Sequence, residues 1–183
     1  MENITLHQKE FRLFIKAVDI DEAISRMANQ INQDLKEKSP LFLPILNGSF
    51  MFASDLMKQI TIPGTQISFL KVSSYSGTHS SGNVKELIGL NEEIKGRTLV
   101  ILEDIIDSGR TLSYLRKNLE ARNPNSVRVC CLLDKKERRE VEVEVNYVGF
   151  DIPDEFVVGY GLDFAGQYRN LPYIGVLAPS AYL

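Results

Sequence analysis

Tryptophan is absent from the sequence, and histidine and cysteine each occur only twice among the 183 residues. The two histidines, His7 and His79, are too few for a metal site that is built from several imidazole ligands. Cys130 and Cys131 are adjacent in a β-rich run, so their side chains would point to opposite faces of a strand. This arrangement predicts reduced core residues and no disulfide, and we expect a cytoplasmic location.

Long hydrophobic runs and net positive charge are also missing. No apolar stretch approaches the ~20 residues that cross a bilayer, and the N-terminal segment lacks the pattern of a secretory signal. The net charge of −3 argues against general electrostatic binding to nucleic acid. We therefore expect neither a membrane nor a nucleic-acid partner. A hydrophobic content of 44% is enough for one packed domain, which we expect to span residues 1–183.

Apolar runs of strand length alternate with segments of helical periodicity over the middle of the chain. The predicted helices span 20–35, 50–60 and a segment that begins at Thr111. The predicted strands are 41–46, 66–72, 84–90, 99–102 and 127–133, with shorter candidates at 11–15 (an edge strand), 147–150, 156–158 and 173–177. This alternation predicts an α/β fold in which helices cover both faces of a mainly parallel sheet.

The most informative stretch, 99–112, reads LVILEDIIDSGRTL, which is a buried strand, an acidic turn and the start of a helix. Open α/β sheets bind ligands at such strand-to-helix turns. Ser108, Gly109 and Thr111 offer backbone N–H groups and hydroxyls near a helix N-terminus, which suits a phosphate group. The stretch contains neither of the common glycine-rich nucleotide fingerprints.

Three acids in this stretch, Glu103, Asp104 and Asp107, would repel a bare phosphate and must face another part of the ligand. A sugar with two neighbouring hydroxyls would satisfy them, because carboxylates accept hydrogen bonds from a diol. The alternative is a solvated turn in which Asp107 or Ser108 caps the following helix. That alternative does not explain two adjacent acids placed directly after a buried strand.

The run Glu103-Asp104-Ile105-Ile106-Asp107-Ser108-Gly109-Arg110-Thr111 resembles the phosphoribosyl pyrophosphate motif of the type I phosphoribosyltransferases, in its hypoxanthine-guanine version. The resemblance covers most of residues 41–178. It implies the fold of that family, with a small hood formed by the N- and C-terminal segments. It also implies a Mg²⁺-dependent purine salvage enzyme. Such an enzyme transfers the phosphoribosyl group from phosphoribosyl pyrophosphate to hypoxanthine or guanine, giving IMP or GMP and pyrophosphate.

The resemblance assigns a role to each residue of this motif. It implies binding of the ribose and the 5′-phosphate by Glu103, Asp104, Asp107, Ser108, Gly109, Arg110 and Thr111. Asp107 would also be the catalytic residue and accept the proton from purine N7, since a deprotonated purine is the better nucleophile.

Two further segments resemble the loops that surround the pyrophosphate in this family. Leu46-Asn47-Gly48-Ser49 is similar to the pyrophosphate turn, which usually reads Leu-Lys-Gly and often contains a cis peptide bond. Asn47 replaces the lysine and removes a positive charge. Ser74 and Tyr75 match a pair in the flexible catalytic loop, here within 73–83, which would shield the reaction from water.

The base pocket is implied by Lys135 and by the run 156–163, FVVGYGLD. Lys135 would donate to the purine 6-oxo group and thereby reject 6-aminopurines. Phe156 would stack on the base, and the Val157 backbone would contact its edge.

The remaining residues that the resemblance implies bind the metal and the leaving group. Asp163 would line the purine site and help to hold Mg²⁺ together with Glu103 and Asp104. Arg169 would bind pyrophosphate oxygens in a bidentate way, alongside Asn47 and Gly48.

Two other functions are compatible with this motif. A non-catalytic relative would bind phosphoribosyl pyrophosphate as a regulatory ligand, but would need a nucleic-acid-binding face. An enzyme for adenine or a pyrimidine would need a different residue in place of Lys135. The family usually forms dimers or tetramers, so we expect a homo-oligomer.

Overall fold

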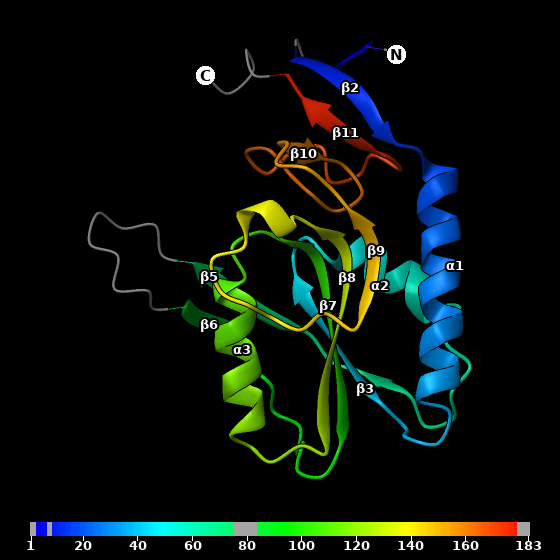
Figure 1. Ribbon diagram of the computed structural model, residues 1–183, viewed down its shortest axis with the longest axis vertical. Helices are drawn as coiled ribbons and strands as arrows, with labels where there is room; N and C mark the ends of the chain where they lie inside the picture. The colour runs from blue at the N-terminus through cyan, green and yellow to red at the C-terminus, as the bar shows by residue number, and fades with distance from the viewer. Residues whose placement is uncertain (1–2, 7–8, 75–83, 179–183) are drawn as a thin grey trace.

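The computed structural model describes residues 3–6, 9–74 and 84–178, and shows a central sheet between helices with a smaller sheet above it (Figure 1). The central sheet contains β3 (Leu41–Leu46), β4 (Gln66–Ile67), β5 (Leu70–Ser74), β6 (Val84–Ile88), β7 (Thr98–Ile106), β8 (Ser126–Asp134) and β9 (Tyr147–Asp151). The helices are α1 (Ala17–Asp34), α2 (Phe50–Met57) and α3 (Arg110–Glu120), with a short 3₁₀ turn, η1 (Lys136–Arg138).

The central sheet has the strand order β6-β5-β3-β7-β8-β9, and β4 pairs with the other end of β3. All of these pairings are parallel except that of β5 with β6. The carboxyl ends of β3, β7 and β8 therefore lie at one edge of the sheet, below the smaller sheet. The predicted mainly parallel sheet is confirmed.

Helices cover both faces of this sheet, and residues 99–102 of the central strand β7 are apolar without alternation because both faces of the strand are buried there. One core joins α1 and α2 to the side of the sheet that contains Leu102 and Cys130. The other core joins α3 to the side that contains Ile101 and Cys131. The two cysteines are free and buried on opposite faces, as predicted.

The smaller sheet, called the hood here, is antiparallel in the order β1-β2-β11-β10. Its strands are β1 (Asn3–Leu6), β2 (Lys9–Ile15), β10 (Val157–Val158) and β11 (Ile174–Leu177). It has a small core of its own, in which the rings of Phe11 and Tyr168 meet edge to face with centroids 4.8 Å apart. The prediction of an edge strand at 11–15 is wrong, because β2 has paired neighbours on both sides.

Three other predicted elements differ from the structure. The strand predicted at 99–102 continues as β7 to Ile106, so Glu103 and Asp104 belong to the strand and not to the turn after it. The strand predicted at 66–72 is interrupted, because β4 pairs with the start of β3 and β5 with its end. Between them the Ser68 N–H donates to the carbonyl of Phe42. The helix predicted at 50–60 ends at Met57, and the residues after it form a turn.

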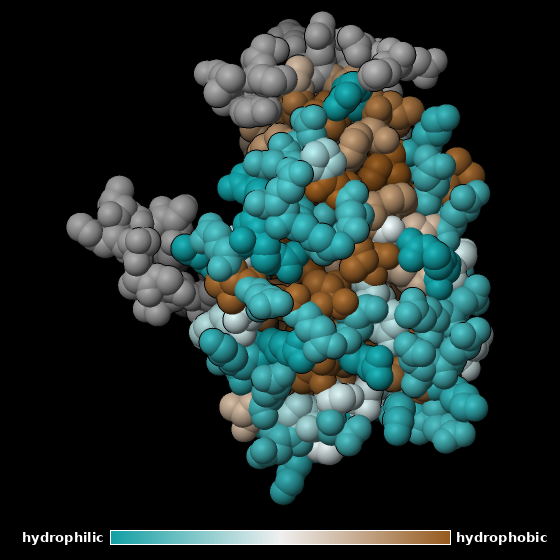
Figure 2. All heavy atoms as spheres, viewed as in Figure 1, coloured by the Kyte–Doolittle hydropathy of each residue, from teal (hydrophilic) through white to brown (hydrophobic). Residues whose placement is uncertain are grey.

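Hydrophilic side chains predominate over α1 and α3 on the face shown in Figure 2, and hydrophobic atoms gather toward the hood. Within the part of the chain that the structure describes, no helix combines the length and apolarity needed to cross a membrane.

Candidate active site

A polar cavity of about 380 Å³ lies at the carboxyl edge of the central sheet, below the hood. It brings together six residues that the sequence predicted for one site: Gly48, Glu103, Asp104, Thr111, Asp163 and Arg169. Ile45, Leu46 and Val72 complete its lining. These residues come from β3, β5, β7, α3, the turn after β3 and the hood, so the topology gathers segments that are far apart in sequence.

The turn after β3 places backbone atoms beside the acids of β7. The peptide bond between Leu46 and Asn47 is cis, as the resemblance implied. Gly48 lies so close to the Asp104 carboxylate that a β-carbon at this position would collide with it. Asn47 is exposed and is not among the residues that line the cavity. The glycine is therefore required by the close approach of the turn to Asp104.

Glu103 and Asp104 emerge from the buried part of β7 and are both largely shielded from water. Burial, with a smaller contribution from Asp104, raises the pKa of Glu103 well above its usual range. Burial likewise raises the pKa of Asp104 to about 6, although the backbone N–H of Ile105 and the charge of Arg169 oppose the shift. Glu103 Oε2 is buried without a hydrogen-bond partner among the described residues. The pair is thus suited to a ligand that brings hydroxyl donors or positive charge.

The turn between β7 and α3 leads into the helix at Gly109, which is buried. Gly109 is the N-cap of α3 and has a left-handed backbone, with φ of 79°. Because a glycine is the N-cap and no side chain makes a capping hydrogen bond, the predicted cap by Asp107 or Ser108 is wrong. Ser108 Oγ instead accepts a long 3.4 Å hydrogen bond from the N–H of Arg110. Arg110 is exposed and forms an ion pair with Glu140 at 2.5 Å.

Lys135 follows β8 directly and points to the same edge of the sheet. Its side chain is only 8% exposed, and its Nζ lies 3.1 Å from Asp107 Oδ1 and 3.6 Å from Asp154 Oδ1. Its backbone N–H donates to the carbonyl of Ile106, which fixes the lysine beside the acidic turn. The structure therefore places the predicted base-binding lysine in contact with the predicted catalytic acid.

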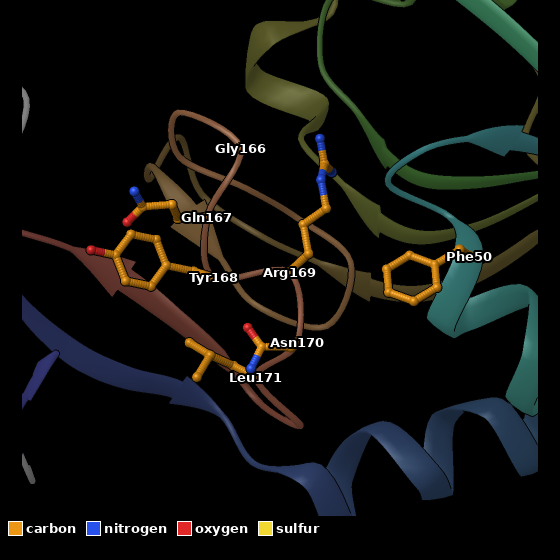
Figure 3. A pocket seen from close by; sticks show the side chains of 7 residues that line it. All are labelled: Phe50, Gly166, Gln167, Tyr168, Arg169, Asn170 and Leu171. Atoms are coloured by element: carbon orange, nitrogen blue, oxygen red, sulfur yellow. The ribbon is translucent and has the colours of Figure 1, made fainter. Parts of the chain in front are cut away.

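Asp163 and Arg169 face the cavity from the loop that joins the hood strands β10 and β11, and they form an ion pair at 2.6 Å. Arg169 also donates to the Gly161 carbonyl at 2.6 Å, and the Gly166 N–H donates to Asp163 at 2.7 Å. Figure 3 shows Arg169 in a second cavity, which is lined by residues 166–171 and by the ring of Phe50 from α2. Arg169 and Tyr168 leave this loop in different directions, so adjacent residues serve the cavity and the hood core.

The remaining predicted residues lie around this edge or outside the described part of the chain. Phe156 is 38% exposed and meets the ring of Phe164 edge to face, with centroids 5.8 Å apart. Val157 is buried in β10. Ser74 is the last residue of β5, and Tyr75 lies outside the described residues.

Two contributors to the site were not predicted as site residues. Gly161 has φ of 99° and packs against the carbonyl of Gly48, so a β-carbon there would collide with backbone. Its signal in the sequence was the glycine pair that flanks Tyr160. Asp154 is the second carboxylate beside Lys135, and nothing in its local sequence distinguished it from a surface acid.

Comparison with known proteins agrees with this geometry. The phosphoribosyl transferase domain model matches residues 17–165. The hypoxanthine-guanine phosphoribosyltransferase of Streptococcus pyogenes is 44% identical over 97% of this chain and 98% of its own length. A crystal structure of a hypoxanthine phosphoribosyltransferase from Staphylococcus aureus superposes with a TM-score of 0.90 at 42% identity, covering 94% of each chain.

A longer relative shares the same domain. The bifunctional protein TilS/HprT of Listeria monocytogenes is 44% identical over 98% of this chain, which spans only 28% of the length of that relative. The chain therefore belongs to the type I phosphoribosyltransferase family, and within it to the hypoxanthine-guanine phosphoribosyltransferases.

Proposed function

We propose that the chain transfers the 5-phosphoribosyl group from phosphoribosyl pyrophosphate to hypoxanthine, and also to guanine, in purine salvage. The products would be IMP or GMP and pyrophosphate. The observation that carries the proposal is the single cavity in which the turn after β3, the acids of β7 and the hood pair Asp163–Arg169 converge. Each of these groups suits a different part of the two substrates.

The sugar and its phosphate would bind at β7 and α3. Backbone N–H groups near Gly109, at the N-terminus of α3, suit the 5′-phosphate because the helix dipole favours an anion there. Glu103 and Asp104 would accept hydrogen bonds from the ribose hydroxyls. Their negative charge would also stabilise the positive charge that develops on the ribose as pyrophosphate departs.

The leaving pyrophosphate would lie between the turn after β3 and the hood. Gly48 would offer its backbone, and Arg169 would offer the planar fork that pairs with phosphate oxygens. Arg169 would then exchange its contact with Asp163 for one with substrate. Asn47 would contribute no charge here.

The purine would lie beside Lys135 and Asp107, with Phe156 stacked on its face. Lys135 Nζ lies 3.1 Å from Asp107 Oδ1 and would hold this carboxylate beside the purine, where it could accept the proton from N7. The same ammonium would donate to a 6-oxo group. A 6-amino group would present a donor to a donor, which gives a physical basis for rejecting adenine.

Magnesium fits the donor set of this cavity. Glu103, Asp104 and Asp163 all line it, and the buried, unpartnered Glu103 Oε2 is an oxygen that a hard cation could satisfy. Among the described residues no three acids, histidines or cysteines gather into a complete metal cage. Mg²⁺ usually takes only one or two carboxylates and completes its shell with water and substrate phosphates. Bound there, it would neutralise charge on the pyrophosphate.

The remaining proposals concern the setting of the enzyme. The two free buried cysteines support a cytoplasmic location. The whole chain would act as one domain and assemble as a homodimer or homotetramer, as is usual in this family, which sedimentation equilibrium would test.

A panel of bases tests the proposed reaction. The protein would be mixed with Mg²⁺, phosphoribosyl pyrophosphate and either hypoxanthine, guanine, xanthine, adenine or a pyrimidine, and pyrophosphate release would be measured. We expect release with hypoxanthine and none with adenine. Tight binding of phosphoribosyl pyrophosphate without release for any base would contradict the proposal and favour a regulatory relative.

The variant Asp107→Ala tests the role of the proposed proton acceptor. Loss of general-base catalysis should lower kcat by about 10²–10⁴-fold while the chain remains folded. Circular dichroism and kcat with hypoxanthine would be measured together. An unchanged kcat would remove Asp107 from this role.

A further inference from the structure

Arg139 is a largely buried cation outside the cavity, and none of the roles described above uses it. Its side chain is 16% exposed and forms an ion pair with Asp134, whose side chain is only 4% exposed. Its Nε is buried and has no hydrogen-bond partner among the residues that the structure describes. A charge in such surroundings is costly unless it has a partner, so the pair with Asp134 fixes where the side chain lies.

This ion pair closes the segment 134–141, called the 134–141 turn here. Asp134 is the last residue of β8, Lys135 follows it, and η1 returns the chain to Arg139. The N–H of Arg139 donates to the carbonyl of Lys136 within the same turn. In Figure 1 the yellow segment that follows β8 passes the top of α3 before it enters β9.

The far end of the 134–141 turn packs against residues 107–110, the turn between β7 and α3, which is called the phosphate loop here. The N–H groups of Glu140 and Val141 both donate to the carbonyl of Ser108, at 3.0 Å each. The carbonyl of Val141 and the Arg139 side-chain stem form the wall against which Gly109 packs, leaving no room for a β-carbon. The left-handed N-cap of α3 therefore lies on this turn.

The near end of the 134–141 turn contains Lys135. Its side chain contacts Asp107, which lies at the start of the phosphate loop. One short segment thus holds the Asp107 side chain through Lys135 and the Ser108–Gly109 backbone through residues 139–141. The Asp134–Arg139 pair is the connection that sets the distance between these two ends.

We propose that Arg139 is a positioning residue that, through its ion pair with Asp134, holds the phosphate loop and the base-binding lysine in register. This inference rests on the proposed function, because the loop is taken to bind the 5′-phosphate and Lys135 the purine. It predicts that losing the pair weakens the binding of both substrates, although Arg139 contacts neither.

The variant Arg139→Met keeps an aliphatic stem beside Gly109 and removes the guanidinium. We expect its Kd for phosphoribosyl pyrophosphate, measured by calorimetry, to rise about tenfold, the lower end of the range known for residues that orient metal ligands. KM for hypoxanthine should rise as well. Arg139→Lys should recover most of this loss because it restores a cation beside Asp134.

The double variant Asp134→Asn, Arg139→Met separates positioning from stability. It leaves no buried unpaired carboxylate, so it should unfold at a higher urea concentration than Arg139→Met alone. Its affinity for phosphoribosyl pyrophosphate should nevertheless stay as weak as that of the single variant. Recovery of affinity together with stability would overturn the proposal and leave the pair a structural role only.

Arg128→Met is the control, since it removes an arginine of β8 that also has an acidic partner, Asp34. It should leave Kd for phosphoribosyl pyrophosphate unchanged. If Arg139→Met also leaves Kd unchanged, the inference is wrong. Calorimetry needs no turnover, so a wild-type chain that binds phosphoribosyl pyrophosphate but forms no product would refute the proposed function alone.

Discussion

At the scale of single residues, the acids of the site differ in what compensates their charge. Asp163 is paired with Arg169 and Asp107 with Lys135, whereas Glu103 and Asp104 stand together without a cation in direct contact among the described residues. The free protein therefore stores unfavourable electrostatic energy in the β7 pair, which a ligand can relieve.

The variant Asp104→Asn tests this interpretation through the pH dependence of stability. The pKa of Asp104 is about 6 in the folded chain and near 3.8 when unfolded, so the folded state binds more protons between these values. Stability contributed by this group falls as pH rises through that window and stays low above pH 6. Removing the charge should raise the free energy of unfolding at pH 8 by at most about 3 kcal/mol, and little at pH 4.

Urea unfolding of the wild type and the variant at both pH values measures this effect. Asp163→Asn serves as the comparison, because it removes an acid of the same cavity that is already paired with Arg169. That comparison variant should gain no stability at pH 8. Equal stability of Asp104→Asn and wild type at pH 8 would show that the carboxylate is not strained in the free protein.

The types of the site residues could be predicted from the sequence, and several of their contacts could not. Adjacent acids after an apolar strand, followed by Ser-Gly-Arg-Thr, predict a sugar-phosphate site from local chemistry alone. The contact of Lys135 with Asp107 depends instead on the strand ends of β7 and β8 meeting, whereas the pair of Arg139 with Asp134 depends on how η1 returns the chain. A local pattern contains no information about that meeting.

At the scale of elements, two turns that are 113 residues apart in sequence form one wall of the cavity. Gly161 packs on the carbonyl of Gly48, and Gly48 packs on Asp104. Tyr160 adds a hydrogen bond between the same segments, since its hydroxyl donates to Asp55 of α2 at 2.6 Å. The loop between β10 and β11 is therefore joined to α2 and to the turn before it, beside the proposed pyrophosphate site.

The variant Gly161→Ala should weaken this joint. Its left-handed backbone disfavours a side chain, and the new β-carbon would collide with the Gly48 carbonyl. We expect the free energy of unfolding to fall by about 1–3 kcal/mol and the affinity for pyrophosphate to fall with it. Urea unfolding and calorimetry with Mg²⁺ and pyrophosphate would measure the two effects.

Gly166→Ala is the control for Gly161→Ala. Gly166 has a similar left-handed backbone, with φ of 80°, but a β-carbon there meets nothing within 4 Å. It should lose some stability from backbone strain and keep its affinity for pyrophosphate. Equal losses of affinity in both variants would mean that contact with Gly48 is unimportant.

The strands and helices of the central layer followed from hydrophobic periodicity, since β3, β7 and β8 are buried on both faces and α1 and α3 have one apolar face. The pairing of the hood strands was harder to predict from their own sequence. Whether β2 lies at an edge depends on a partner strand at the opposite end of the chain, and the break between β4 and β5 depends on how β3 pairs at each end.

At the scale of the whole molecule, the central sheet divides the interior into two cores that are filled independently. α1 and α2 pack on one face and α3 on the other, and neighbouring residues of β7 and β8 serve different cores. The site lies where both cores end, so it inherits its rigidity from both layers. Loss of either core would release strand ends that carry site residues.

Cys130 and Cys131 give each of these cores one thiol. Burial raises the pKa of both thiols far above the usual range, so neither forms the reactive thiolate in the folded chain. The S–H of Cys131 also donates to the Leu133 carbonyl at 2.8 Å. A disulfide reagent should therefore modify the pair only when a core opens, and both thiols should react with one rate constant.

The rate of thiol modification therefore reports how often the sheet opens, and it can be followed by absorbance without any introduced label. A ligand present at 100 times its Kd should slow thiol modification about 100-fold, because the ligand binds only the closed form. The measurement would rank phosphoribosyl pyrophosphate, pyrophosphate and each base by affinity without any turnover. Rapid modification of one thiol while the other stays protected would show instead that the two faces of the sheet open separately.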